Sequence, residues 1–537
     1  MARNPVIRGF APDPSLVRAG DWYYVATSSF EWFPTIPIHR SRDLAHWEYA
    51  GHVQGAAPGG TLAGVPDSGG IWAPSLSWDG DRFWVVYAVV RSVGTPYFDL
   101  DTYVSTAPDV AGPWAEPRRV ASHGFDPALF HEDGRLWLLN LQNDHRPGGR
   151  RFAGIVLTEL DRETLAPRGE THLLLQHERL IEGPKVVRRD GWYHLVLAEG
   201  GTGFEHGVRT ARSRRLTGPY VLADLPLLTS RDDPKLPLQK AGHAELVETP
   251  GGEWFLSHLA ARPLDTPHGP RCTLGRETAI QAVTWDAEGN PRLRQGGWHP
   301  AVEVDVDVDV DRDLPKRPQP QQPQQPQSPL GWPWSSLREP PDPSWADVTS
   351  RPGWIRLRGR HGPESRWAQS LLAQRLTEHR ATAQVTVEAR PSSFTQAAGL
   401  ILRYDAEAYL CLDLTWAEPE GEPQCGQQWS GGGGGRTVLS LLERDERGAR
   451  EAAVVEVDAS GPLTLGVTVE GVEACFWYVR DGVRVPVGPS LDCGRLSDDH
   501  GDRLRFTGTL AGVHVRDLVD ASFTADFRDF RLTCTPC

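Results

Sequence analysis

The chain has 537 residues, of which 39% are hydrophobic, and contains 20 Trp and 55 Gly. This composition is typical of an all-β globular protein with two or more domains. No stretch approaches the roughly 18 apolar residues of a membrane-spanning helix, and a formal net charge of −14 without a basic block argues against a nucleic-acid partner. We therefore expect neither a membrane nor a nucleic acid as a partner.

The N-terminus and the cysteines predict a cytoplasmic protein. The first residues, Met1-Ala2-Arg3-Asn4-Pro5, run directly into a repeated motif and leave no room for a signal peptide. A secreted mature form stays open. The seven cysteines are odd in number and lack the tight spacing of metal ligands, which favours reduced thiols. Whether the chain forms a homo-oligomer is also left open.

A motif recurs five times in the first half of the chain. Each copy has a short segment, usually built around proline, then a Gly turn and an aromatic-rich apolar run. The turn glycines are Gly20, Gly80, Gly134, Gly191 and Gly252. They recur about every 60 residues, and further strand-like segments complete four strands in each copy. The spacing favours a five-bladed β-propeller over residues 1–300 rather than a β-sandwich.

The pattern changes after residue 300. Alternating Val and Asp over residues 304–311 can form an edge strand, and a Pro/Gln tract follows from Pro315 to Pro329. That tract has too little apolar surface to fold, so residues 301–330 are predicted to be a linker. Residues 331–537 contain alternating strands joined by turns, which predicts a concanavalin- or lectin-like β-sandwich. This domain shows no dense stripe of exposed aromatic residues of the kind that marks a sugar-binding module.

The five repeats differ at the position that a propeller brings to its central axis. In chain order, this column holds Asp13, Ala73, Asp126, Glu182 (offset by one residue) and His243. Three carboxylates on one axis predict acid–base chemistry. Hydrolysis of a glycosidic bond with inversion needs two carboxyl groups roughly 6.5–9.5 Å apart. Asp126 is expected beside the acid, where its like charge raises the pKa of that acid.

Other side chains next to the axis motifs are candidates for sugar binding. Aromatic rings suited to stacking, and a small residue that leaves space for a sugar ring, are found at Phe30, Trp72, Phe125 and Ala73. Arg276 is predicted to point toward the axis, where it would offset the carboxylates and donate to sugar hydroxyls. His243 has three open interpretations: a core histidine, a metal ligand or a proton partner. No metal ligand is assigned from the sequence.

Several motifs together resemble one known family. They are Ala11-Pro12-Asp13-Pro14-Ser15, Gly70-Ile71-Trp72-Ala73-Pro74, Gly124-Phe125-Asp126, Glu182-Gly183-Pro184, Ala241-Gly242-His243, Leu274-Gly275-Arg276-Glu277-Thr278 and, in the C-terminal domain, Phe506-Thr507-Gly508. With these motifs, the chain resembles the β-xylosidases of glycoside hydrolase family 43 over nearly its whole length.

The resemblance implies an inverting exo-hydrolase that releases D-xylose from the non-reducing end of small β-1,4-xylo-oligosaccharides. By motif match, Asp13 is the general base, Glu182 the general acid, and Asp126 the residue that tunes and orients the acid. The resemblance also implies sugar binding by Arg276, Phe30, Trp72 and Phe125, and closure of the pocket by a sandwich loop carrying Phe506. Asn143 stands where relatives carry a Trp, which leaves aglycone stacking open.

Alternative functions remain at this stage. α-L-arabinofuranosidase activity, alone or beside xylosidase activity, is open because the two sugars present similar geometry at the cleaved bond. A retaining fructosidase would need a motif of the Asn-Asp-Pro-Asn type, which the sequence lacks. A non-catalytic sugar-binding propeller is the alternative from another functional class. No cofactor is required by this chemistry, although a structural or activating Ca²⁺ near the propeller axis is left open.

Overall fold

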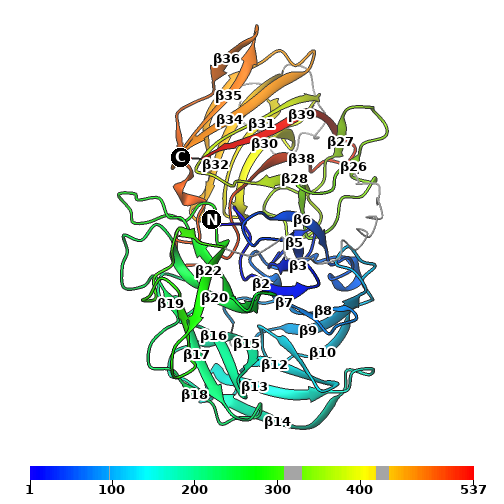
Figure 1. Cartoon of the computed structure of the whole chain (residues 1–537). Helices are drawn as coiled ribbons and strands as arrows, with labels where there is room; N and C mark the ends of the chain where they lie inside the picture. The colour runs from blue at the N-terminus through cyan, green and yellow to red at the C-terminus, as the bar shows by residue number, and fades with distance from the viewer. Residues whose placement is uncertain (96, 307–328, 419–434, 537) are drawn as a thin grey trace. The chain divides into compact units, whose positions relative to one another are not determined.

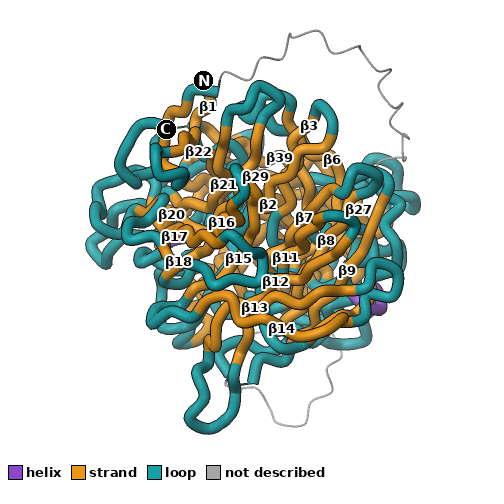
Figure 2. Tube along the Cα trace, turned by 60° about the horizontal axis from the view of Figure 1, so that its bottom comes forward, coloured by secondary structure: helices purple, strands orange, loops and turns teal. Residues whose placement is uncertain are grey.

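The structure is a computed structural model, and it describes residues 1–95, 97–306, 329–418 and 435–536. Nearly all of the elements in these ranges are β-strands (Figure 2). Two short 3-10 turns are described besides the strands, η1 (Pro58–Gly60) and η2 (Cys493–Arg495). The all-β class expected from composition is therefore confirmed.

The chain divides into two compact units. The first comprises Met1–Pro263 and Arg276–Gln325, and the second comprises Leu264–Gly275 and Pro326–Cys537. The division by sequence did not anticipate that residues 264–275, inside the fifth repeat, belong to the second unit. Most of the predicted linker, residues 307–328, lies outside the described residues.

Five antiparallel sheets of the first unit correspond to the five sequence repeats (Figure 1). Blade one consists of β2 (Ser15–Ala19), β3 (Trp22–Ala26), β5 (Pro37–Ser41) and β6 (Glu48–His52). Blade two consists of β7 (Gly70–Trp78), β8 (Phe83–Val90), β9 (Leu100–Ala107) and β10 (Arg118–Ala121). Blade three consists of β11 (Ala128–Glu132), β12 (Arg135–Asn143), β13 (Phe152–Leu160) and β14 (Pro167–Leu175). Blade four consists of β15 (Ile181–Arg189), β16 (Trp192–Glu199), β17 (Gly207–Ser213), β18 (Val221–Leu222) and β19 (Leu228–Thr229). Blade five consists of β20 (Gln239–Glu248), β21 (Trp254–Ala261), β22 (Glu277–Trp285) and β23 (Pro291–Leu293). A short strand, β4 (Trp32–Phe33), lies between β3 and β5 in the chain.

The first strands of the five blades form a closed ring. β2 contacts β7, β7 contacts β11, β11 contacts β15, β15 contacts β20, and β20 returns to β2. The five turn glycines named from the sequence all have positive φ, between 61° and 99°. Glycine adopts this left-handed conformation without the strain of a Cβ atom, which is why it marks each hairpin between the first and second strand of a blade. The predicted five-bladed propeller is confirmed.

Apolar side chains fill the spaces between blades. Tyr24 and Ile38 of blade one pack in one cluster with Val85 and Tyr87 of blade two, and similar clusters join the other neighbouring blades. Each blade is therefore buried on both faces, as its nearly continuous apolar second strand requires.

The N-terminal segment closes the ring against blade five. β1 (Ala2–Arg3) pairs with β24 (Glu303–Val304). The Asn4 side-chain amide donates to the carbonyls of Ile280 (2.7 Å) and Ala301 (2.9 Å). Of the edge strand expected over residues 304–311, the described residues show only Val304 in a strand, since β24 ends there, and the residues from 307 onward lie outside the described part.

The second unit is a sandwich of two antiparallel sheets. One sheet has the order β33-β32-β31-β30-β38-β28-β25 and the other β26-β27-β39-β29-β34-β35-β36, with β37 beside β35. The strands are β25 (Ser335–Leu337), β26 (Ala346–Asp347), β27 (Ile355–Arg358), β28 (Ser370–Arg375), β29 (Arg380–Ala389), β30 (Gln396–Asp405), β31 (Ala408–Ala417), β32 (Arg436–Asp445), β33 (Gly448–Glu456), β34 (Leu463–Glu470), β35 (Glu473–Arg480), β36 (Val483–Pro486), β37 (Leu491–Asp492), β38 (Leu510–Asp517) and β39 (Thr524–Thr535). Leu400, Leu412, Val467 and Val513 belong to the core of this unit. The predicted β-sandwich is confirmed.

The connection between β21 and β22 is held by residues of the second unit. The Cys272 N–H donates to a carboxylate oxygen of Asp499 (2.9 Å) and to the Ser497 hydroxyl (3.1 Å). Arg271 donates to the Asp499 carbonyl (2.6 Å). Both ends of this connection are covalently continuous with blade five, so the two units are linked by the chain at three places rather than one.

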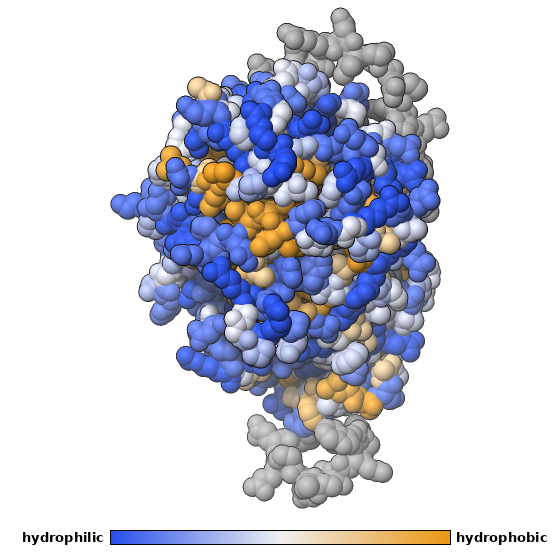
Figure 3. All heavy atoms as spheres, turned by 90° about the horizontal axis from the view of Figure 1, so that it is seen from below, coloured by the Kyte–Doolittle hydropathy of each residue, from blue (hydrophilic) through white to orange (hydrophobic). Residues whose placement is uncertain are grey.

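Hydrophilic side chains cover most of the face drawn in Figure 3, and apolar side chains gather near its centre. Within the described ranges, no helix has the length and apolar character needed to cross a membrane. The expected absence of a membrane partner stays a prediction.

Candidate active site

The first strands of three blades carry the predicted carboxylates. Asp13 lies just before β2, Asp126 just before β11, and Glu182 is the second residue of β15. All three are buried, with exposed fractions of 6%, 6% and 9%. The charge of Asp13 raises the pKa values of both Asp126 and Glu182, so the three carboxyl groups interact within one site.

The backbone repeats an unusual conformation at this position of the blades. Asp13, Asp126 and His243 have φ values of 55°, 54° and 46°, and Gly183 has 57°. A non-glycine residue in this left-handed region costs conformational energy, and such residues gather at functional sites. The shared conformation means that the propeller repeats the same bend where it presents these residues.

Asp13 is held as a carboxylate. Its Oδ2 accepts a hydrogen bond from the Ser28 hydroxyl (2.5 Å), and its Oδ1 accepts one from Arg276 Nη1 (3.0 Å). Burial by itself would raise the pKa of Asp13, but the positive charge of Arg276, with smaller contributions that include the Ser28 hydrogen bond, outweighs burial and holds the pKa below 3.8. Asp13 is therefore ionised across the neutral range, as a general base must be.

Arg276 lies where the sequence predicted it. It is almost fully buried, with 2% exposed, and it donates to the Thr202 hydroxyl (2.6 Å) as well as to Asp13. Its guanidinium carbon lies 5.8 Å from the centroid of the Phe30 ring. An arginine held on three sides is a rigid donor, and its charge compensates part of the negative charge that the carboxylates bring into this site.

Glu182 has the opposite electrostatic character to Asp13. Burial is the largest cause that raises its pKa well above 4.5, and the charges of Asp126 and Asp13 raise it further. The pKa of Asp126 is also raised, to about 7, first by burial and then by Asp13. Asp126 accepts a hydrogen bond from the Gly183 N–H (3.0 Å), which stabilises its carboxylate, so the proton shared by this pair favours Glu182. The like charge of Asp126 was predicted to raise the pKa of the acid, and it does so, but burial raises that pKa more.

His243 lies between Asp13 and Gly183. Its Nδ1 is 3.6 Å from Asp13 Oδ1, and a Cβ atom placed on Gly183 would lie 3.0 Å from its Nε2. Burial lowers the pKa of His243 to about 4, so the imidazole is neutral near pH 7. A second buried histidine, His206, was not found from the sequence. Its ring lies so close to Gly242 that a Cβ atom there would approach within 2.0 Å.

Aromatic rings form a continuous cluster beside the carboxylates. Trp72 lies 6.4 Å from Phe30 and 5.5 Å from Phe125 between ring centroids, and Phe98 packs against both Trp72 and Phe125. The Trp72 indole N–H donates to the Ser68 carbonyl (2.9 Å), which fixes the orientation of the ring. Ala73, in the same strand as Trp72, is buried and small. The stacking roles of these residues remain predictions.

Family comparisons agree with this geometry. The model of glycosyl hydrolases family 43 matches residues 2–291, and the model of the beta-xylosidase C-terminal concanavalin A-like domain matches residues 326–533. The chain belongs to glycosyl hydrolase family 43. It is a glycosidase with a five-bladed propeller followed by a concanavalin A-like domain.

Individual relatives cover nearly the whole family 43 chain. A protein from Humicola insolens named xylosidase/arabinosidase 43B is 37% identical over 98% of this chain and 97% of its own length. A Vibrio protein named xylan 1,3-beta-xylosidase is 35% identical over 98% of each chain. The crystal structure of the xylan beta-1,4-xylosidase from Bacillus halodurans has a TM-score of 0.90 and 39% identity, and covers 99% of this chain and 100% of that one.

Two further predicted residues of this glycosidase do not belong to the first strands of the blades. Phe506 belongs to the second unit and is buried, with 9% exposed. Its role in closing the pocket stays a prediction. Asn143 is the last residue of β12, and its N–H donates to the His123 carbonyl (2.8 Å). Its effect on the aglycone likewise stays a prediction.

The side chains at the propeller axis determine whether a divalent cation can bind there. Among the described residues, the two groups of three side chains that could hold a metal are Cys411, Asp413, His514 and Cys272, Asp498, Asp499. Both groups lie in the second unit, and neither includes His243. Arg276 donates to Asp13 Oδ1, the oxygen nearest His243, so a cation bound there would meet a guanidinium. The axis residues thus do not fit a cation coordinated by Asp13, and no reaction step is assigned to one.

The first strands of blades four and five also form a buried ion pair that was not predicted from the sequence. Lys185 of β15 and Glu245 of β20 approach to 3.6 Å. Glu245 also accepts hydrogen bonds from the Ser15 hydroxyl (2.7 Å) and the Leu16 N–H (2.9 Å). The pair therefore ties blades four, five and one together. The sequence shows Lys185 and Glu245 only as charged residues in two first strands that also carry other charged residues, so their pairing becomes visible only when the strands are known to converge.

Removing the Lys185 charge is expected to destabilise the propeller. In Lys185→Met, Glu245 would remain buried without its cation, a change that costs about 3 kcal/mol when one partner of a buried pair is lost. We expect a lower thermal unfolding midpoint by calorimetry. Lys185→Met combined with Glu245→Gln should recover part of the loss. Lys235→Met, at an exposed lysine, serves as the control, and wild-type stability in Lys185→Met would contradict the structural role of the pair.

Proposed function

We propose that this family 43 glycosidase is an inverting exo-β-xylosidase that releases D-xylose from the non-reducing end of β-1,4-xylo-oligosaccharides. The observation that carries the proposal is the opposite electrostatic character of Asp13 and Glu182 in one buried site. Arg276 keeps Asp13 ionised, while burial keeps a proton on Glu182. Two carboxyl groups with pKa values pushed apart are the acid and base that glycoside hydrolysis needs.

The reaction follows from these states. Glu182 donates its proton to the glycosidic oxygen as the bond to the anomeric carbon breaks. Asp13 removes a proton from a water molecule, which attacks that carbon from the opposite face and inverts its configuration. Arg276 and the aromatic rings at Trp72, Phe30 and Phe125 would bind the sugar. After the products leave, Asp13 must lose and Glu182 must regain a proton before the next turnover.

The alternative proposal is α-L-arabinofuranosidase activity, alone or in addition. It is favoured by the name of the Humicola insolens relative, which covers both sugars. The name of the Vibrio relative specifies a 1,3 linkage, so the linkage also requires a test. The propeller residues near the carboxylates are compatible with either sugar, because both present a similar anomeric carbon to the acid and base.

A substrate panel tests the proposed function. We expect hydrolysis of nitrophenyl β-D-xylopyranoside and release of xylose from β-1,4-xylobiose, at higher kcat/KM than hydrolysis of nitrophenyl α-L-arabinofuranoside. β-1,3-xylobiose is the matched control for linkage. Activity on the arabinofuranoside alone would replace the proposal with its alternative, and absence of turnover on the whole panel would reject both.

A further inference from the structure

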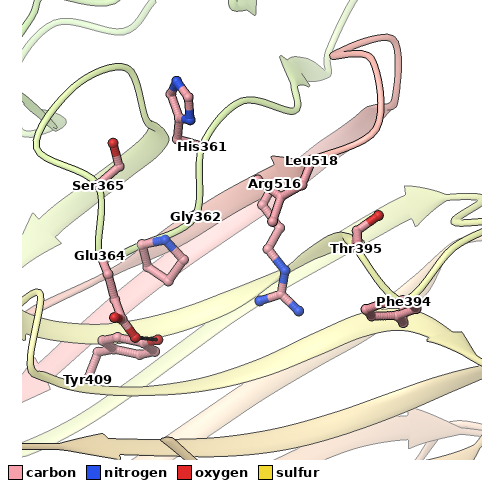
Figure 4. A pocket seen from close by; sticks show the side chains of 10 residues that line it. His361, Gly362, Glu364, Ser365, Phe394, Thr395, Tyr409, Arg516 and Leu518 are labelled. Atoms are coloured by element: carbon pink, nitrogen blue, oxygen red, sulfur yellow. Dashed lines mark hydrogen bonds between the residues drawn. The ribbon is translucent and has the colours of Figure 1, made fainter. Parts of the chain in front are cut away.

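The sandwich domain has a groove that is separate from the propeller carboxylates. It contains about 430 Å³ of space, within the roughly 300–1,000 Å³ typical of small-molecule sites. Its walls come from the loop between β27 and β28, the turn between β29 and β30, and strands β31 and β38 (Figure 4). The residues that line the groove include Glu364, Phe394, Thr395, Tyr409, Arg516 and Leu518.

The groove lies on the polar face of one sandwich sheet. Side chains alternate between the two faces of a strand. Along β31, Leu410, Leu412 and Leu414 belong to the apolar core, so Tyr409 and Asp413 lie on the opposite face. The Pro363 carbonyl accepts a hydrogen bond from Arg403 (2.6 Å), which fastens the first loop over this face. The groove is therefore bordered by polar residues that the core does not use.

Buried partners fix the polar groups that line the groove. Asp413 is fully buried and accepts hydrogen bonds from His514 (2.7 Å) and Arg516 (3.0 Å). Arg516 uses its Nη1 for this bond, and Figure 4 shows its guanidinium projecting between Glu364 and Phe394. Because the hydrogen bond from His514 holds the Asp413 carboxylate in place, Arg516 presents its N–H donors at a defined position.

The opposite wall presents an acceptor that is fixed in the same way. Glu364 Oε1 accepts hydrogen bonds from Arg444 Nε (2.9 Å) and the Tyr409 hydroxyl (3.3 Å). Both of these bonds are made by Oε1. Phe394 is 49% exposed, and Leu518 is 57% exposed. The groove thus combines an exposed ring, an acceptor and a donor, and hydrogen bonds orient the acceptor and the donor.

The charges of the groove are balanced, which selects the class of ligand. Arg516 is neutralised by Asp413, and Glu364 by Arg444. An anion or a cation would gain little net attraction from these pairs. A neutral ligand with many hydroxyl groups and apolar C–H faces matches both the hydrogen-bonding groups and the aromatic ring. That description fits an oligosaccharide.

We propose that this groove is a second, non-catalytic binding site for a neutral oligosaccharide. Its specific ligand, a xylan chain, rests on the proposed function, whereas the saccharide class rests on the groove itself. A site of this kind would hold the polysaccharide near the enzyme and raise the local concentration of chain ends. This site was not predicted from the sequence, because its exposed aromatic ring is the single Phe394 rather than a stripe of aromatic residues.

Binding of xylohexaose to the full chain tests the proposal. The measurements use Glu182→Gln as background, so that the ligand is not hydrolysed, and isothermal titration calorimetry as the readout. We expect a binding event besides that of the catalytic pocket, and Phe394→Ala should weaken this event about tenfold, as loss of one aromatic contact can do. Glu364→Gln should weaken it as well, and it leaves the buried Asp413–Arg516 pair intact.

The controls separate the groove from catalysis. Val483→Ala, at a side chain of β36 that is 64% exposed, should leave both binding events unchanged. In the wild-type background, Phe394→Ala should hydrolyse nitrophenyl β-D-xylopyranoside at the wild-type rate. A single binding event, or a second one that Phe394→Ala and Glu364→Gln do not change, would overturn the proposal. Failure of the proposed function would appear differently, as absence of xyloside hydrolysis by the wild type, and Phe394-dependent binding of another neutral hexasaccharide would then still support the groove.

Discussion

Glu182→Gln is expected to lower kcat for β-1,4-xylobiose about a thousandfold, because a general acid contributes roughly 10²–10⁴ to such a rate. Glutamine has nearly the same shape but cannot give a proton to the leaving sugar. A nitrophenyl xyloside needs less protonation of its leaving group, so its rate should fall less. Steady-state kinetics on the two substrates measure this difference. Glu178→Gln, at an exposed glutamate four residues earlier in the chain, is the matched control.

The pH dependence provides an independent check on the acid. The pKa of Glu182 is raised, so activity should be lost on the alkaline side as Glu182 loses its proton. The charge of Asp126 is one cause of that raised pKa, and Asp126→Asn removes it. The pKa of Glu182 should then fall, and the alkaline limb of kcat/KM should move to lower pH. An alkaline limb that Asp126→Asn leaves in place would show that the two carboxyl groups do not interact as described.

Asp13→Asn is expected to lower kcat by a comparable factor, about a thousandfold, on both the disaccharide and the aryl glycoside. Water attack needs a base whatever the leaving group, so activation of the leaving group should not restore the rate. This lack of dependence on the leaving group distinguishes Asp13→Asn from Glu182→Gln. Asp21→Asn, in the exposed turn that follows β2, is the control and should behave as wild type.

The acid limb of the pH profile reports on Asp13. Its pKa is held below 3.8, so the base stays ionised until the pH falls below that value, and activity should persist to that point. Ser28→Ala removes one hydrogen bond to the carboxylate, which should raise the pKa of Asp13 and move the acid limb to higher pH. NMR of the first product should show the inverted anomer. Net retention is incompatible with Asp13 acting as a base on water.

Much of the propeller could be predicted from the sequence because its signals are local. A Gly turn between two apolar runs, as at Gly20 or Gly191, forms a hairpin through contacts a few residues apart. Repetition of that signal fixes the number of blades without any knowledge of distant contacts. The same repetition identified the axis column, and within it Asp13, Asp126 and Glu182.

The partners of those residues could not be predicted in the same way. The Asp13–Arg276 pair interacts with Ser28, Thr202 and His206. Each of these is a single polar residue that belongs to no repeated pattern in the sequence. Lys185 and Glu245 are 60 residues apart and meet only because blades four and five are neighbours in the ring. Long-range contacts of this kind depend on closure of the whole propeller.

By itself, the sequence determined the two β architectures, the order of the blades and the three carboxyl groups at the axis. The tertiary structure decided which of those groups holds a proton, because burial and the position of Arg276 set their pKa values in opposite directions. It also assigned residues 264–275 to the second unit and revealed the sandwich groove. These features arise where strands distant in the sequence meet, and the hydrophobic periodicity of one strand does not reveal which strands lie next to it.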